Sequence, residues 1–229
     1  MNPCQLVLII GSFDYNKNDM KITKLTPQTK NPQRVNVFVD GAFYCGVDAS
    51  VAFRLSLSPG MVITPEISGE LSTQDEFARG WNYALRCLRV ASQSVRRLRE
   101  KLTRRLENEE LADEIMKRLI EADLVNDQRL AESVIARFAS SKTKSVREIR
   151  LLLQKKGISP ALIRSLETNL NEIDPKEAIA KLAEGKLRQV RDSDPKVRFE
   201  KTAAYLARKG FRYNEIKAVL DELLLSRDL

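Results

Sequence analysis

One helical pattern occurs three times along this chain, and no other feature of the sequence restricts the fold as strongly. In its clearest copy, Ser145 and Glu148 have the spacing of a capping box, in which each side chain bonds a backbone amide at a helix start. An apolar stripe at helical spacing follows, and Gly157 stands where a helix ends in the left-handed conformation. Similar patterns begin 51 residues earlier, at Ser94, and end 53 residues later, at Gly210. A period of about fifty residues predicts helical repeats that each bury an apolar face against the next.

The helix after each copy repeats as well. Its apolar positions are Ala112, Ile115 and Leu119, then Ile163, Leu166 and Leu170, then Ile216, Val219 and Leu223. We therefore predict a mainly α protein with three tandem three-helix repeats, covering residues 72–123, 124–172 and 173–229. Because each repeat stacks on its neighbour, the array is expected to be elongated and curved.

Helix starts in the array are predicted from capping residues. Ser72-Thr73 with Glu76 is expected to open the first long helix, and Asp127 is interpreted as the cap of a helix that begins at Gln128. A proline at the first helical position after a serine or aspartate predicts three more starts, at Pro160, Pro175 and Pro195. The helix from Pro160 is expected to run to Leu170.

Residues 20–71 predict a small α+β module. Apolar residues alternate in Arg34–Asp40, and Asp40-Gly41 is a strong hairpin signal because both turn residues must adopt positive φ. The other expected elements are strands at Lys21–Thr26, Ala42–Val47 and Met61–Thr64, and a short helix over Ala49–Leu57. Residues 1–19 are interpreted as a disordered extension or an overcalled start before Met20, with an edge strand at residues 5–10 as the alternative.

Composition excludes several kinds of chemistry. The chain has no histidine, and its three cysteines lack C-x-x-C spacing, so neither histidine-based catalysis nor a zinc site is indicated. We expect no catalytic residue, no cofactor and no metal. No apolar run approaches the ~20 residues that span a bilayer, and the first apolar stretch is too short for a signal peptide. A cytoplasmic protein without membrane contact is therefore predicted.

The charge balance points to an acidic partner. Lysine and arginine number 39 against 31 aspartates and glutamates, and residues 1–70 contain six of each sign, so the whole net charge of +8 lies on residues 71–229. A basic helical array suits nucleic acid or an acidic protein surface. Ordinary solvated helix faces are the alternative.

The candidate binding residues are cations that project outward from the predicted helices: Arg89, Arg96, Arg97, Arg104, Arg147, Arg150, Lys155 and Lys156. The two lysines also stand in a last helical turn, where cations are favoured in any case. Trp81 and Tyr83 are expected to pack in the core rather than to stack on bases. Cys87 is interpreted as a small core residue.

Taken in order, these motifs resemble the RecX regulators, bacterial proteins that restrain the RecA recombinase. The matching segments are ALRCL (84–88), SVRRLREKL (94–102), LVNDQRLAESVIARF (124–138), VREIRLLLQKKGI (146–158) and, in the third repeat, FEKTAAYLARKGF (199–211). The module at residues 20–71 resembles the N-terminal extension of such proteins. Asn126-Asp127 stands where the family often has two acids.

The resemblance implies a binding protein rather than an enzyme. Such regulators dock along the groove of the RecA–single-stranded DNA filament, where they inhibit recombination and the co-protease activity of the SOS response. The expected partners are therefore the RecA filament and, more weakly and without sequence preference, single-stranded DNA, with the protein acting as a monomer. Three alternatives stay open: a free-standing helix-turn-helix DNA-binding protein, a nuclease built on Asp/Glu pairs, and a structural scaffold.

Overall fold

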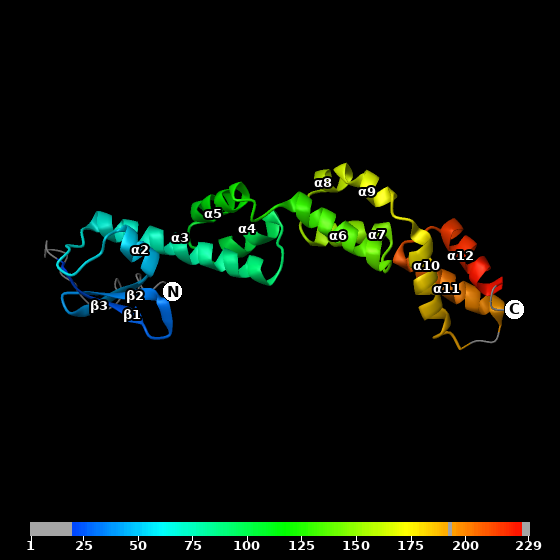
Figure 1. Ribbon diagram of the computed structural model, residues 1–229, viewed down its shortest axis with the longest axis horizontal. Coiled ribbons are helices and arrows are strands. Elements are labelled where there is room, and N and C mark those ends of the chain that lie inside the picture. Colours follow the sequence, from blue (N-terminus) through cyan, green and yellow to red (C-terminus); the bar gives the residue numbers. More distant parts are fainter. Residues whose placement is uncertain (1–19, 192–193, 226–229) are drawn as a thin grey trace. The chain divides into compact units, whose positions relative to one another are not determined.

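The computed structural model describes residues 20–191 and 194–225, and it consists of a three-stranded antiparallel sheet followed by helices (Figure 1). The prediction of a mainly α protein with a small β module is confirmed. The chain divides into two compact units. Unit 1 holds the residues up to Val90 together with Arg99–Leu119, and unit 2 holds Ala91–Leu98 together with the residues from Ile120 on. The interpretations of residues 1–19 lie outside the described residues.

The sheet of unit 1 has the strand order β1-β2-β3, formed by Ile22–Gln28, Asn31–Val39 and Ala42–Asp48. The predicted hairpin turn is confirmed, since Asp40 and Gly41 both have positive φ, of 49° and 84°. The predicted strand at Met61–Thr64 is wrong, because this segment makes only a single antiparallel bridge, between Val62 and Lys21. The next helix begins at Pro65, which leaves no room for a longer strand.

Two helices cover this sheet, and both differ in length from the prediction. Helix α2 spans Ala49–Arg54 and is capped by Asp48 as predicted, but it ends early because Ser56 adopts a positive φ of 51°. Helix α3 spans Pro65–Val90, so the predicted start at Ser72-Thr73 is wrong. Its first turns bury Leu71 in the same core as the sheet valines, and this packing favours helix well before the capping signal.

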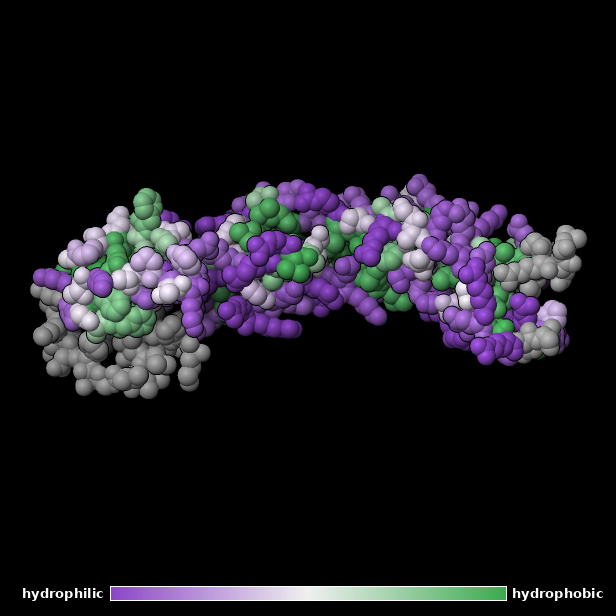
Figure 2. All heavy atoms as spheres, turned by 60° about the horizontal axis from the view of Figure 1, so that its bottom comes forward, coloured by the Kyte–Doolittle hydropathy of each residue, from purple (hydrophilic) through white to green (hydrophobic). Residues whose placement is uncertain are grey.

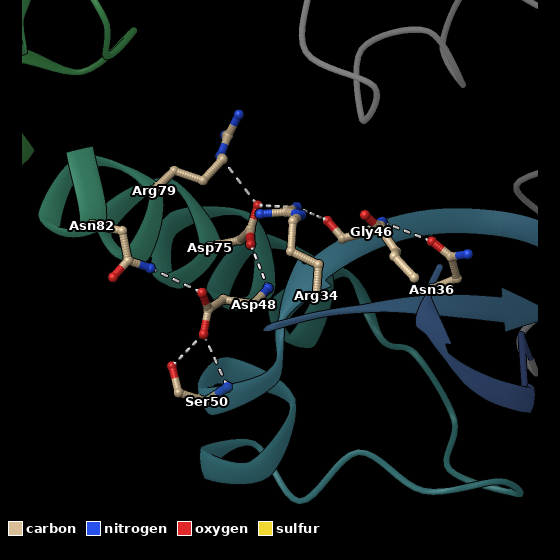
Figure 3. Close-up of polar contacts among 9 residues, drawn as sticks. Arg34, Asn36, Gly46, Asp48, Ser50, Asp75, Arg79 and Asn82 are labelled. Carbon is tan, nitrogen blue, oxygen red and sulfur yellow. Dashed lines mark hydrogen bonds and ion pairs between the residues drawn. The ribbon is translucent and has the colours of Figure 1, made fainter. Parts of the chain in front are cut away.

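A buried polar network fastens α3 to the sheet (Figure 3). Asp75 is 7% exposed, and one carboxylate oxygen accepts a 2.8 Å hydrogen bond from the backbone N–H of Asp48. The other oxygen lies 3.1 Å from Nη2 of Arg34 and 3.2 Å from Nε of Arg79. Asn82 in turn donates to the carboxylate of Asp48. Two ion pairs and these hydrogen bonds compensate the burial of the Asp75 charge.

The next two helices are α4, Val95–Thr103, and α5, Glu109–Glu121. Within unit 1, α5 packs closely on α3 at Gly80, where a Cβ atom would lie 2.6 Å from Cδ1 of Ile115. Glycine at this position therefore permits a close approach of the two helices.

Unit 2 contains two further sets of helices, each around a core of its own. The first set is α6 (Asp127–Ser141), α7 (Val146–Lys155), α8 (Pro160–Ser165) and α9 (Glu167–Asn171); the second is α10 (Pro175–Leu187), α11 (Pro195–Lys209) and α12 (Tyr213–Leu225). The predicted single helix Pro160–Leu170 is wrong, since the chain bends at Leu166 between α8 and α9. The side chain of Leu166 stays in the core at this bend, since the residue is only 4% exposed.

Capping explains most helix starts in unit 2. Ser145, Ser159, Asp174 and Asp194 cap α7, α8, α10 and α11 as predicted, and the capping box at Ser145 is complete. The interpretation of Asp127 as a cap of its own helix is wrong. The cap of α6 is Asn126, whose side chain accepts a 3.0 Å hydrogen bond from the backbone N–H of Arg129.

Candidate functional site

The start of α7 meets the end of α11, and we call this contact the α7–α11 junction. The hydroxyl of Ser145 donates a 2.6 Å hydrogen bond to the carbonyl oxygen of Lys209 and accepts a 3.1 Å bond from the backbone N–H of Glu148. Gly210 follows with a φ of 93°, and a Cβ atom there would lie 2.8 Å from Cδ of Arg147. The aliphatic stem of Arg147 therefore lies directly over the end of α11.

The start of α4 meets the end of α7 in the same way, entirely within unit 2, and we call this contact the α4–α7 junction. Ser94 donates a 2.5 Å hydrogen bond to the carbonyl oxygen of Lys156 and accepts a 3.3 Å bond from the backbone N–H of Arg97. Gly157 follows with a φ of 87°, and a Cβ atom there would lie 3.4 Å from Cγ of Arg97. Both glycines end their helices in the left-handed conformation, as predicted for Gly157.

Asp127 belongs to the α4–α7 junction as well. One of its carboxylate oxygens accepts a 2.9 Å hydrogen bond from the backbone N–H of Val95, at the first residue of α4. An acid is favoured at this end of a helix because the first backbone amides have no partner within the helix. Asp127 therefore caps a neighbouring helix instead of its own.

The two junctions collect five of the eight predicted cations. Arg96, Arg97 and Lys156 lie at the α4–α7 junction together with Lys155, the last residue of α7, and Arg147 lies at the α7–α11 junction. Residue-by-residue reasoning missed two further cations at the second junction, Arg208 and Lys209. The repeat itself contains the signal for them, because Arg208-Lys209-Gly210 is the later copy of Lys155-Lys156-Gly157.

The other three predicted cations lie elsewhere. Arg89 is in the last turn of α3 and Arg104 follows the end of α4; both are exposed, and both belong to unit 1. Arg150 was expected to project outward, but it is half-buried and forms an ion pair with Glu167 of α9. A carboxylate of the chain itself therefore neutralises Arg150.

The two junctions have opposite charges at one equivalent position, three residues after the junction serine. In the α7–α11 junction, Oε1 of Glu148 lies 3.4 Å from Nζ of Lys209. Arg97 holds the equivalent position in α4, and Lys156 is the equivalent of Lys209. Within the described residues, Arg97, Lys155 and Lys156 form no ion pair. The α4–α7 junction therefore places cations where the other junction has a neutral pair.

The aromatic residues of α3 are not in the core. Phe77 and Trp81 stack with ring centroids 6.2 Å apart, and both are half-buried along an open groove of about 620 Å³. Tyr83 is also half-buried, and its pKa is raised, first by its hydrogen bond with Cys87 and then by burial. The prediction of core packing for Trp81 and Tyr83 is therefore wrong.

On the face drawn in Figure 2, hydrophilic residues cover much of the helical part, and hydrophobic residues form smaller patches among them. In the part of the chain that the structure describes, no three or more acidic or cysteine side chains are grouped as metal ligands would be. Nor does any described helix combine the length and apolar content needed to cross a bilayer.

A small sheet module followed by helices with one recurring sequence pattern defines a class of helical-repeat proteins. Two family models match the chain: the regulatory protein RecX N-terminal domain over residues 20–64, and the RecX third three-helix domain over residues 172–220. The regulatory protein RecX of Listeria monocytogenes serovar 1/2a is 30% identical over 211 residues, which cover 92% of this chain and 78% of the relative. The regulatory protein RecX of Clostridioides difficile strain 630 is 29% identical over 203 residues, which cover 89% of this chain and 95% of the relative.

Solved structures agree with these sequence matches. A crystal structure of regulatory protein RecX has a TM-score of 0.64 and 25% identity, and covers 88% of this chain and 99% of its own. The crystal structure of RecX from Lactobacillus salivarius has a TM-score of 0.57 and 28% identity, and the match covers 66% of this chain and 99% of that one. The chain belongs to the RecX family of regulatory proteins.

Proposed function

We propose that this protein docks on the RecA–single-stranded DNA filament and inhibits its recombinase and co-protease activities, without catalysing a reaction itself. Membership of the RecX family supports a regulatory role. The observation that carries the proposal is the α4–α7 junction, where four cations lie at the ends of two helices. Arginine and lysine there suit the phosphates and carboxylates that a nucleoprotein filament offers.

The way the repeats contact one another also supports a long binding surface. The same serine-to-carbonyl bond joins helices of successive repeats at both junctions. Repeats joined in one manner present equivalent side chains at regular intervals, as a helical filament presents equivalent subunits. The division into repeats at residues 72–123, 124–172 and 173–229, the curvature of the array and the monomeric state stay predictions.

The test is the ATPase activity of RecA from the same organism on single-stranded DNA, with this protein titrated in. We expect inhibition, and we expect the double variant Arg96→Glu/Arg97→Glu to lose it while its helical circular dichroism is unchanged. Arg164→Glu is the control for a charge reversal outside the junctions, with half the change in net charge, because Arg164 is exposed on α8 and belongs to neither junction. Equal inhibition by the double variant and the wild type would contradict a role for the junction.

A free-standing helix-turn-helix DNA-binding protein is the alternative function. It predicts strong, sequence-selective binding to duplex DNA and no effect on RecA. Gel-shift assays with specific and competitor duplexes separate the two functions, since a filament regulator discriminates little between duplex sequences.

A further inference from the structure

The two junctions of unit 2 are copies of one arrangement, and their difference indicates a ligand. Each has a buried serine that donates to a helix-end carbonyl, followed by a glycine with positive φ. The backbone bonds around each glycine match too, since the amide of Ile158 bonds the carbonyl of Leu153 as that of Phe211 bonds Leu206. Side chains at equivalent positions can therefore be compared directly.

The α7–α11 junction contains its own anion. Glu148 pairs with Lys209 and also accepts a 3.4 Å hydrogen bond from the backbone N–H of Ser145, so its carboxylate lies between the helix start and the lysine. In the α4–α7 junction, Arg97 replaces this carboxylate, and its side chain lies beside Gly157, the residue that follows the equivalent lysine, Lys156. Two cations at these positions repel each other unless an anion lies between them.

Among the residues that the structure describes, no acid forms an ion pair with Arg97. Asp127 faces the junction, but one of its oxygens is bonded to the backbone N–H of Val95. Within the described residues, neither Arg97 nor Lys156 forms an ion pair. Arg96 and Lys155 add further positive charge on the same two helix ends.

We infer that the α4–α7 junction binds a phosphate of a nucleic-acid backbone, at the place that the Glu148 carboxylate occupies in the α7–α11 junction. A phosphate fits better than a protein carboxylate because Arg97, Lys155 and Lys156 together exceed the single charge of a carboxylate, whereas a backbone brings several phosphates in series. The planar guanidinium of Arg97 matches two phosphate oxygens at once. This inference deepens the proposed function, since it names the part of the filament that the junction contacts.

The charge at the equivalent positions 97 and 148 should therefore decide whether a junction binds phosphate. Arg97→Glu recreates the carboxylate of the other junction, which would pair with Lys156 and exclude phosphate. Glu148→Arg does the opposite, because it removes the internal anion from Lys209 and creates a second phosphate site. One substitution should therefore abolish a site, and the other should add one.

The test measures fluorescence anisotropy of a labelled oligothymidylate with the purified full-length variants across a KCl series, in the absence of RecA. Arg97→Glu should bind several-fold more weakly than Arg164→Glu, which changes the net charge equally, and its salt slope should be flatter by about 0.7 for each phosphate that the variant no longer binds. Glu148→Arg should bind several-fold more tightly than wild type, with a steeper slope. Circular dichroism of each variant checks that the helices are intact.

Two results would overturn the inference. One is equal binding curves for Arg97→Glu and Arg164→Glu. The other is a variant Arg97→Glu that binds labelled polyglutamate more weakly than wild type but binds the oligothymidylate equally well. That result would assign the junction to carboxylates. Because RecA is absent from the assay, a failure of the proposed inhibition would leave this outcome unchanged.

Discussion

The hydroxyl of Ser145 donates a hydrogen bond of 2.6 Å to the carbonyl oxygen of Lys209, 64 residues further along the chain. The same oxygen of Ser145 caps α7 by accepting from the backbone N–H of Glu148. One side chain thus satisfies a free amide at the start of α7 and a free carbonyl at the end of α11. Ser94 repeats both bonds at the α4–α7 junction, with Arg97 and Lys156.

Replacing Ser145 should therefore cost more stability than replacing an ordinary helix cap. For Ser145→Ala we expect a loss near the upper end of the ~0.5–2 kcal/mol typical of caps, because the partly buried carbonyl of Lys209 also loses its donor. Ser159→Ala is the control, since Ser159 is exposed and, among the described residues, its side chain bonds only the backbone N–H of Leu162 in its own helix. Urea denaturation measures both changes, and an equal loss in the two variants would contradict a role for the bond to Lys209.

Gly157 and Gly185 should respond in opposite directions to alanine. At Gly157 an alanine would meet a positive φ of 87° and place its Cβ 2.8 Å from Oγ of Ser94, so Gly157→Ala should lower the melting temperature. Gly185 lies inside α10 with no atom within 4 Å of the Cβ position, so Gly185→Ala should stabilise the protein by about 0.5–1 kcal/mol. Calorimetry checks the signs, and a stabilised Gly157→Ala would show that the junction adapts freely.

The buried and exposed faces of the repeated helix predict very different costs. Leu153 is fully buried on α7, and Leu153→Ala should cost about 2–5 kcal/mol in unfolding free energy. Arg97 is exposed on α4, and Arg97→Ala should change stability by less than ~0.5 kcal/mol. If chemical denaturation shows Arg97→Ala to be the more destabilising change, the assignment of faces is wrong.

The Asp75 network should hold the sheet module on α3. Asp75→Asn keeps the shape of the side chain but removes the charge that faces Arg34 and Arg79, and we expect a loss of about 1–3 kcal/mol. Asp113→Asn should have a far smaller effect, because Asp113 pairs with Arg99 in solvent. Hydrogen exchange of the strand amides localises the loss, and unchanged protection of β2 and β3 would contradict this role.

Local chemistry made much of this fold predictable. Caps, the Asp40-Gly41 turn and the C-terminal glycines act within a few residues of the backbone groups that they satisfy, so each can be recognised from a short segment. The periodicity then indicated the helical array, because equivalent apolar residues recur wherever equivalent cores are built.

Tertiary contacts decided those helix starts and side-chain partners that no short segment of the sequence indicates. Helix α3 begins at Pro65 because its first turns pack on the sheet, and Asp127 caps α4 rather than its own helix because folding brings Val95 beside it. Outward cations were predictable from helical spacing, but their partners were not. Glu167 neutralises Arg150 and Glu148 pairs with Lys209 across distances of 17 and 61 residues, and such pairs depend on where whole helices pack. The sequence by itself therefore determined which residues are cations on helix surfaces. Only the tertiary structure decided which of them pair with an acid, because such a pair forms only where packing brings two helices together.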